Sequence, residues 1–122
     1  MQKILVIDDD MFVRRTIERV LQKSGYHVHV AADGLEGLRT FRTVQPDLVI
    51  TDIIMPVKEG LDTIRLLRTW SPDTKIIAIS GGSRTANKDL LREAAELGAS
   101  VVIAKPFEPD ELLVKVSNCL AA

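Results

Sequence analysis

Short apolar runs alternate with longer amphipathic stretches along the whole chain, and this alternation limits the possible folds severely. The runs are rich in β-branched side chains, which is typical of strands. The predicted strands are Ile4–Ile7, Val28–Ala31, Leu48–Thr51, Ile76–Ile79 and Val101–Ala104. Most of them are apolar throughout, as strands of a parallel sheet are when helices cover both faces. Only the second alternates with polar residues, so it is predicted to lie at an edge of the sheet.

The stretches between the strands have the spacing of helices that bury one face. Asp10 and Asp33 are predicted to cap the first two helices, the second with Glu36 in a capping box. The third helix is expected over Leu61–Trp70 and the fourth over Asn87–Leu97. The expected buried stripes are Val13, Ile17, Val20 and Leu21 in the first helix, Leu35, Leu38 and Phe41 in the second, Leu90, Leu91, Ala94 and Ala95 in the fourth, and Leu112, Leu113, Val116 and Leu120 in the fifth, which begins at Pro109.

Five repeats of strand and helix predict an α/β fold of the (βα)5 type. Right-handed crossovers would place helices on both faces of a doubly wound, parallel, five-stranded sheet. The chain has 122 residues, so residues 1–122 are expected to form one domain. Functional groups in such sheets gather beyond the carboxyl ends of the strands, near the switch in strand order.

Composition excludes several classes of function. No apolar run is long enough for a transmembrane helix, and the first residues lack the features of a signal peptide. Cys119 is the only cysteine, which fits a reducing compartment, and the cytoplasm is the expected location. The net charge is −1, so direct nucleic-acid binding is not expected. Arg14 and Arg15 are the only adjacent basic pair, and we interpret them as a solvated helix face.

Polar residues follow the predicted strands and should meet at one edge of the sheet. They are Asp8, Asp9 and Asp10 after the first strand, Asp52 after the third, Ser80 after the fourth and Lys105 after the fifth. Each alone has an ordinary explanation as a helix cap, a turn former, a loop residue or a surface charge. Converging carboxylates, however, repel one another unless positive charge lies among them. A divalent cation and a lysine would supply that charge, and with a hydroxyl these groups suit phosphoryl transfer to an aspartate.

In their order and spacing, these residues resemble the receiver domain of two-component response regulators over the full length of the chain. The matching motifs are Val6–Asp10, Asp47–Pro56, Gly60, Ala78–Gly81, Gly98–Ala99 and Lys105–Phe107. The resemblance implies a flavodoxin-like sheet with the strand order 2-1-3-4-5. It also implies a cis peptide before Pro106.

The same resemblance assigns the site residues. Asp52 would accept a phosphoryl group from a sensor histidine kinase or a histidine phosphotransfer protein. Asp8, Asp9, Asp52 and the backbone carbonyl of Ile54 would hold Mg²⁺, while Lys105 and Ser80 would contact the phosphoryl oxygens. Such a domain accepts phosphate and loses it again without being a turnover enzyme. It then acts on a downstream protein, unless these residues belong to a longer chain.

Two features depart from the family pattern, and two other functions remain open. Ile54 and Gly82 stand two residues past Asp52 and Ser80, where receivers that lose their phosphoryl group quickly tend to carry polar side chains. Val102 stands where many receivers have an aromatic residue that changes rotamer as the hydroxyl moves, so that coupled movement is not expected here. Asp8 and Asp10 form the Asp-x-Asp of haloacid dehalogenase phosphatases, although Phe12 stands where those enzymes have Thr or Val and Asp52 would have no role. A pseudo-receiver that binds partners without taking phosphate is the second alternative.

Overall fold

The structure is a computed structural model that describes residues 2–53, 59–80 and 92–121. Its elements are β1 (Lys3–Ile7), α1 (Met11–Lys23), β2 (His27–Ala31), α2 (Gly34–Val44), β3 (Leu48–Asp52), α3 (Glu59–Trp70), β4 (Lys75–Ser80), β5 (Val101–Ala104) and α5 (Pro109–Ala121). Residues 92–97 are also helical and belong to the predicted fourth helix. The first part of that helix, residues 87–91, lies outside the described residues.

The strands form one parallel sheet in the order β2-β1-β3-β4-β5, which confirms the predicted fold class and strand order. β2 is an edge strand, as its alternating sequence predicted. The strand order reverses at β1 and β3, which lie next to each other with Ile7 paired to Thr51. The residues that follow these two strands are therefore neighbours at the carboxyl edge of the sheet.

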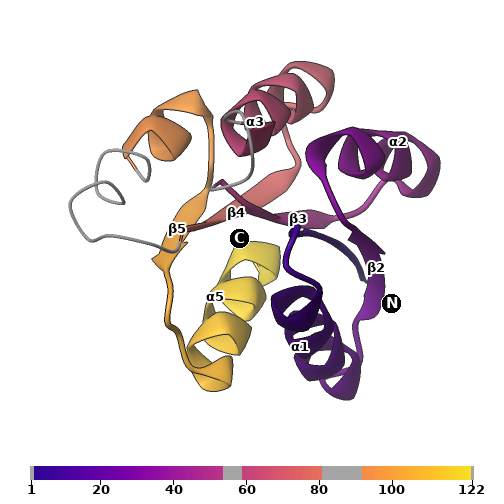
Figure 1. Ribbon diagram of the computed structural model, residues 1–122, viewed down its shortest axis with the longest axis vertical. Coiled ribbons are helices and arrows are strands. Elements are labelled where there is room, and N and C mark those ends of the chain that lie inside the picture. The colour runs from indigo at the N-terminus through magenta and orange to yellow at the C-terminus, as the bar shows by residue number, and fades with distance from the viewer. Residues whose placement is uncertain (1, 54–58, 81–91, 122) are drawn as a thin grey trace.

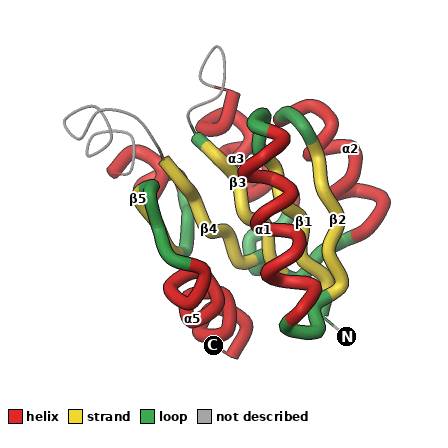
Figure 2. Tube along the Cα trace, turned by 60° about the horizontal axis from the view of Figure 1, so that its bottom comes forward, coloured by secondary structure: helices red, strands yellow, loops and turns green. Residues whose placement is uncertain are grey.

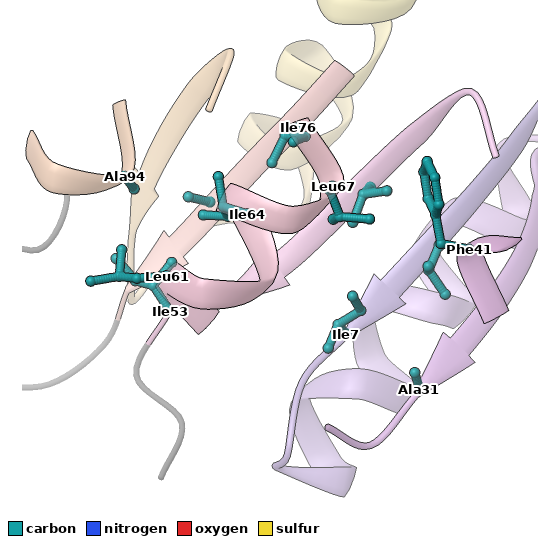
Figure 3. Close-up of a cluster of buried hydrophobic side chains, with 12 residues drawn as sticks. Ile7, Ala31, Phe41, Ile53, Leu61, Ile64, Leu67, Ile76 and Ala94 are labelled. Atoms are coloured by element: carbon teal, nitrogen blue, oxygen red, sulfur yellow. The ribbon is translucent and has the colours of Figure 1, made fainter. Parts of the chain in front are cut away.

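Helices cover both faces of the sheet (Figure 1). Successive strand residues point to opposite faces and belong to two separate cores. Leu5 and Ile7 belong to the core under α2, α3 and residues 92–97, while Ile4 and Val6 belong to the core under α1 and α5. Figure 2 views the molecule from the side of α1 and α5, with α2 and α3 behind the strands. The core under α2 and α3 is drawn in Figure 3 and includes Ile7, Ala31, Phe41, Ile53, Leu61, Ile64, Leu67, Ile76 and Ala94.

Asp10 and Asp33 cap the N-termini of α1 and α2, as predicted. The Asp10 carboxylate accepts hydrogen bonds from the N–H groups of Phe12 and Val13 at 2.9 and 3.3 Å. Asp33 accepts from the Glu36 N–H at 2.8 Å, and the Glu36 carboxylate accepts in turn from the N–H of Ala32 at 3.1 Å. These bonds satisfy N–H groups that have no partner within the helix.

The predicted buried stripe of α2 is wrong at one position. Leu35 is 58% exposed, whereas Gly34, Gly37 and Phe41 face the core. Gly37 lies so close to Ile7 of β1 that a Cβ at this position would overlap the isoleucine side chain. Because the helix lies so close to the strand, glycine is needed on this face of α2, and a search for regularly spaced apolar residues does not detect such a face. Ala95, predicted to be buried, is also exposed, because only Ala94 of this pair points to the sheet.

No helix among the described residues is long and apolar enough to cross a membrane.

Candidate functional site

Three carboxylates meet at the carboxyl edge of the sheet, where β1 and β3 end. Asp8 follows β1 directly, and its N–H donates to the Ala31 carbonyl of the neighbouring strand at 3.2 Å. Asp52 is the last residue of β3 rather than the first residue after it. Oxygen atoms of Asp8, Asp9 and Asp52 all lie within 4.8 Å of one another. Asp8 and Asp52 are buried, while Asp9 is exposed and opens the cluster to solvent.

Lys105 provides the positive charge at this edge. Its Nζ lies 3.1 Å from Oδ2 of Asp52 and 3.4 Å from Oδ2 of Asp8, so one ammonium group pairs with both buried carboxylates. The backbone N–H of Lys105 donates to the Ser80 carbonyl at 2.7 Å, which holds the end of β5 beside the end of β4. The Lys105–Pro106 peptide is cis, as the resemblance implied.

Burial and neighbouring charges perturb two of these groups. Burial is the main cause that raises the pKa of the Asp8 carboxyl, and the charge of Asp52 adds to it, while the Asp10 N–H and Lys105 act in the opposite direction. Burial alone would lower the pKa of the Lys105 ammonium, but the carboxylates of Asp52 and Asp8 outweigh it and raise that pKa. Lys105 therefore remains a cation at neutral pH.

The donor set suits a small divalent cation. Three carboxylates and one ammonium leave two negative charges in excess when all four groups are ionised, and all the candidate ligand atoms are oxygens. Mg²⁺ prefers oxygen ligands and often binds through one or two carboxylates while keeping several waters. The cluster is therefore a candidate metal site. The Ile54 carbonyl, predicted as a further ligand, lies outside the described residues.

Ser80 is the last residue of β4 and is fully buried. In the sheet it pairs with Ala104, directly before Lys105, and it follows Ile79, which pairs with Asp52. The structure thus places the predicted hydroxyl residue at the same edge as Asp52 and Lys105. Val102, which replaces the usual aromatic residue, packs against the core under α2 and α3.

Comparison with known proteins identifies the family. The sequence profile of the response regulator receiver domain matches residues 4–117. The chain belongs to this family. Receiver domains are the parts of two-component systems that partner with histidine kinases. The described fold and the predicted family therefore agree.

Related proteins fall into two groups of different length. The receiver domain is 36% identical to "Protein CcdB" of Bacillus subtilis, with 98% of each chain covered. It is 36% identical to the transcriptional regulatory protein DltR of Streptococcus agalactiae and 37% identical to the response regulator MprA of Mycobacterium, but it spans only about half the length of each. The receiver sequence thus matches both a protein of its own length and part of longer regulators.

Solved structures share the fold along nearly the whole receiver domain. Chemotaxis protein CheY4 of Vibrio cholerae superposes with a TM-score of 0.87 at 31% identity, with 98% of both chains covered. NtrX of Brucella abortus superposes with a TM-score of 0.91 at 27% identity, over 98% of this chain and 27% of NtrX. Family membership and the position of Asp52 in the acidic cluster leave the dehalogenase alternative without support.

Two features of the receiver site were not predicted from the sequence. One is a groove of about 580 Å³ beside Lys105, lined by Phe12, Val13, Thr16 and Ile17 of α1 and by Lys105, Pro106 and Phe107. The other is Arg14, which is half-buried and donates from Nη1 to the Asp8 carbonyl at 2.8 Å. The interpretation of Arg14 as part of a solvated helix face is therefore wrong, whereas Arg15 is exposed as expected. The signal for the groove was Phe12, an aromatic residue outside the predicted apolar stripe.

Proposed function

We propose that Asp52 accepts a phosphoryl group from the phosphohistidine of a sensor histidine kinase or a histidine phosphotransfer protein, in a reaction that requires Mg²⁺. The observation that carries this proposal is the position of the Asp52 carboxylate. It lies 3.1 Å from the Lys105 ammonium and within 4.8 Å of oxygens of Asp8 and Asp9. An aspartate in such a setting has a nucleophilic oxygen together with groups that neutralise an incoming phosphoryl group.

In the transfer step, a carboxylate oxygen of Asp52 forms a bond to phosphorus as the bond from phosphorus to the donor imidazole nitrogen breaks. The electron pair of the broken bond stays on that nitrogen, which takes up a proton. Asp52 becomes an aspartyl phosphate. Because Asp52 ends a buried strand, its carboxylate is held in place before the donor arrives, which lowers the entropic cost of in-line attack.

Asp8, Asp9 and Asp52 would hold the Mg²⁺ ion. When bound, this ion supplies positive charge that stabilises the phosphoryl oxygens during transfer. Lys105 supplies a second positive charge beside Asp52 and shares it with Asp8 in the free protein. In the phosphorylated form its ammonium would move from these carboxylates to a phosphoryl oxygen.

Lys105 and Ser80 would then transmit the change. The backbone bond from Lys105 to Ser80 joins the ends of β5 and β4, so a shift of the lysine side chain acts on both strands. The Ser80 hydroxyl would bind another phosphoryl oxygen. The result is a changed surface for a downstream protein in the cytoplasm. The domain loses its phosphate again by hydrolysis and is not a turnover enzyme.

The groove beside Lys105 supports a protein as the donor. Apolar side chains line most of it, and one of them, Phe12, is 79% exposed. Grooves lined by contiguous exposed apolar side chains commonly mark interaction sites. The net charge of −1 gives no support to direct nucleic-acid binding by these residues.

Incubation with acetyl phosphate and Mg²⁺, followed by intact-mass measurement, tests the proposal. The parent protein should gain one phosphoryl group, and neither Asp52→Asn nor the parent in EDTA should do so. A parent that gains no phosphate under conditions that phosphorylate a known receiver would instead support a pseudo-receiver.

A further inference from the structure

The Asp8 residue is held at each of its polar groups. Its N–H donates to Ala31, one carboxylate oxygen accepts from the Asp10 N–H at 2.9 Å, and the other faces Lys105. The remaining group is the backbone carbonyl, which accepts from Nη1 of Arg14 at 2.8 Å. Arg14 reaches back from α1 to make this bond across the end of β1.

The carbonyl of Asp8 belongs to the same planar peptide unit as the N–H of Asp9. A hydrogen bond that fixes this carbonyl therefore also fixes the plane in which the Asp9 backbone begins. Asp9 is exposed, yet its carboxylate lies within 4.8 Å of those of Asp8 and Asp52. The direction of its backbone thus contributes directly to where this exposed carboxylate points.

We propose that Arg14 is a positioning residue for the metal site: by holding the Asp8–Asp9 peptide, it directs the Asp9 carboxylate toward Asp8 and Asp52. This inference rests on the Mg²⁺ site of the proposed function. Removal of groups that orient metal ligands without touching the metal typically lowers metal affinity or activity by about 10–100-fold.

Charge and position have opposite effects here, which makes the proposal testable. Arg14 is a cation beside a cation site, so a role through charge alone predicts that its neutralisation strengthens Mg²⁺ binding. A role in positioning predicts that neutralisation weakens Mg²⁺ binding. Arg15 offers a matched control, because it is the neighbouring residue on α1, carries the same charge and is exposed.

The experiment titrates the parent, Arg14→Gln, Arg14→Lys and Arg15→Gln with Mg²⁺. Backbone amide NMR monitors each titration at a temperature where each metal-free protein is folded. Arg14→Gln should bind Mg²⁺ about tenfold more weakly, at the lower end of the range for such groups. Arg14→Lys, which keeps the charge and places its N–H donors on a longer side chain than glutamine does, should recover part of the affinity. Arg15→Gln should bind as tightly as the parent or slightly more so. In the metal-free proteins, the Asp9 amide signal should move in Arg14→Gln and stay in place in Arg15→Gln.

Equal or tighter Mg²⁺ binding by Arg14→Gln would overturn the inference and leave the metal site intact. A thermal unfolding scan of each metal-free variant separates a loss of affinity from a loss of folded protein. If the NMR spectrum of the parent does not change with Mg²⁺, the metal site of the proposed function is wrong, and so is the role proposed for Arg14.

Discussion

Replacement of Lys105 by methionine should destabilise the metal-free protein, because it leaves two buried carboxylates without their counter-charge. The ammonium lies 3.1 and 3.4 Å from the oxygens of Asp52 and Asp8. At an effective dielectric constant of about 20, each contact corresponds to a gross attraction of about 5 kcal/mol, most of which the cost of burying the charges offsets. Removal of one partner from a buried pair typically costs about 3–5 kcal/mol. The Lys105 side chain is 22% exposed, so we expect a smaller loss of about 2–3 kcal/mol in the free energy of unfolding.

The sign of this effect follows from the raised pKa of Lys105. A group whose pKa is higher in the folded state stabilises the fold below its unfolded pKa and ceases to do so as the pH rises through the folded pKa. At pH 7 the contribution of Lys105 is therefore fully present. Urea unfolding in EDTA at pH 7 measures it, and Lys23→Met, at an exposed lysine of α1, is a control that should change stability by less than about 0.5 kcal/mol.

Mg²⁺ should act more strongly on the Lys105→Met variant than on the parent. Without the lysine the cluster has a larger excess of negative charge, so the ion should bind more tightly and raise the melting temperature further. A variant as stable as the parent in EDTA, or one that gains less from Mg²⁺, would refute the account of charge balance at this site.

Three further predictions concern Gly37, Asp8 and Phe12. Gly37→Ala should lower the free energy of unfolding by about 1–3 kcal/mol, because its methyl group would overlap Ile7. Adding Ile7→Val should recover part of this loss. If the losses of the two single variants in urea melts simply add up in the double variant, the prediction is wrong. Asp8→Asn should stabilise the metal-free protein by about 0.5–2 kcal/mol at pH 7, since the raised pKa of Asp8 means that its ionised form opposes folding. The gain in stability should disappear as the pH falls through the raised pKa of Asp8. A gain that does not change with pH would contradict this prediction. Phe12→Ala should slow phosphoryl transfer from a phosphohistidine protein by about tenfold, equivalent to about 1.4 kcal/mol, while labelling by acetyl phosphate stays unchanged; equal slowing with both donors would argue against a docking role.

The sequence predicted the fold well because parallel strands have a strong signature. Strands covered on both faces are continuous apolar runs, and β5 has the predicted bounds. The site was also predictable, since the carboxyl ends of parallel strands meet at one edge. The structure accordingly brings Asp8, Asp9, Asp52 and Lys105 together, with Ser80 at the end of the neighbouring strand.

The failures have local physical causes. A helical pattern treats Arg14 and Arg15 alike, but only Arg14 lies on the side of α1 from which a long side chain reaches the end of β1. Leu35 was predicted to be buried because hydrophobic periodicity assigns no weight to glycine, whereas α2 packs through Gly34 and Gly37. The predicted role of the Ile54 carbonyl falls outside the described residues and stays a prediction.

The location of the acyl phosphate tests the central claim most directly. After phosphorylation with acetyl phosphate and Mg²⁺, borohydride converts an aspartyl phosphate to homoserine, and peptide mass spectrometry then identifies the residue. We predict homoserine at position 52 and unchanged aspartates at positions 8 and 9. Homoserine at position 8, or none in a protein that has gained phosphate, would contradict the assignment of Asp52 as the phosphoacceptor.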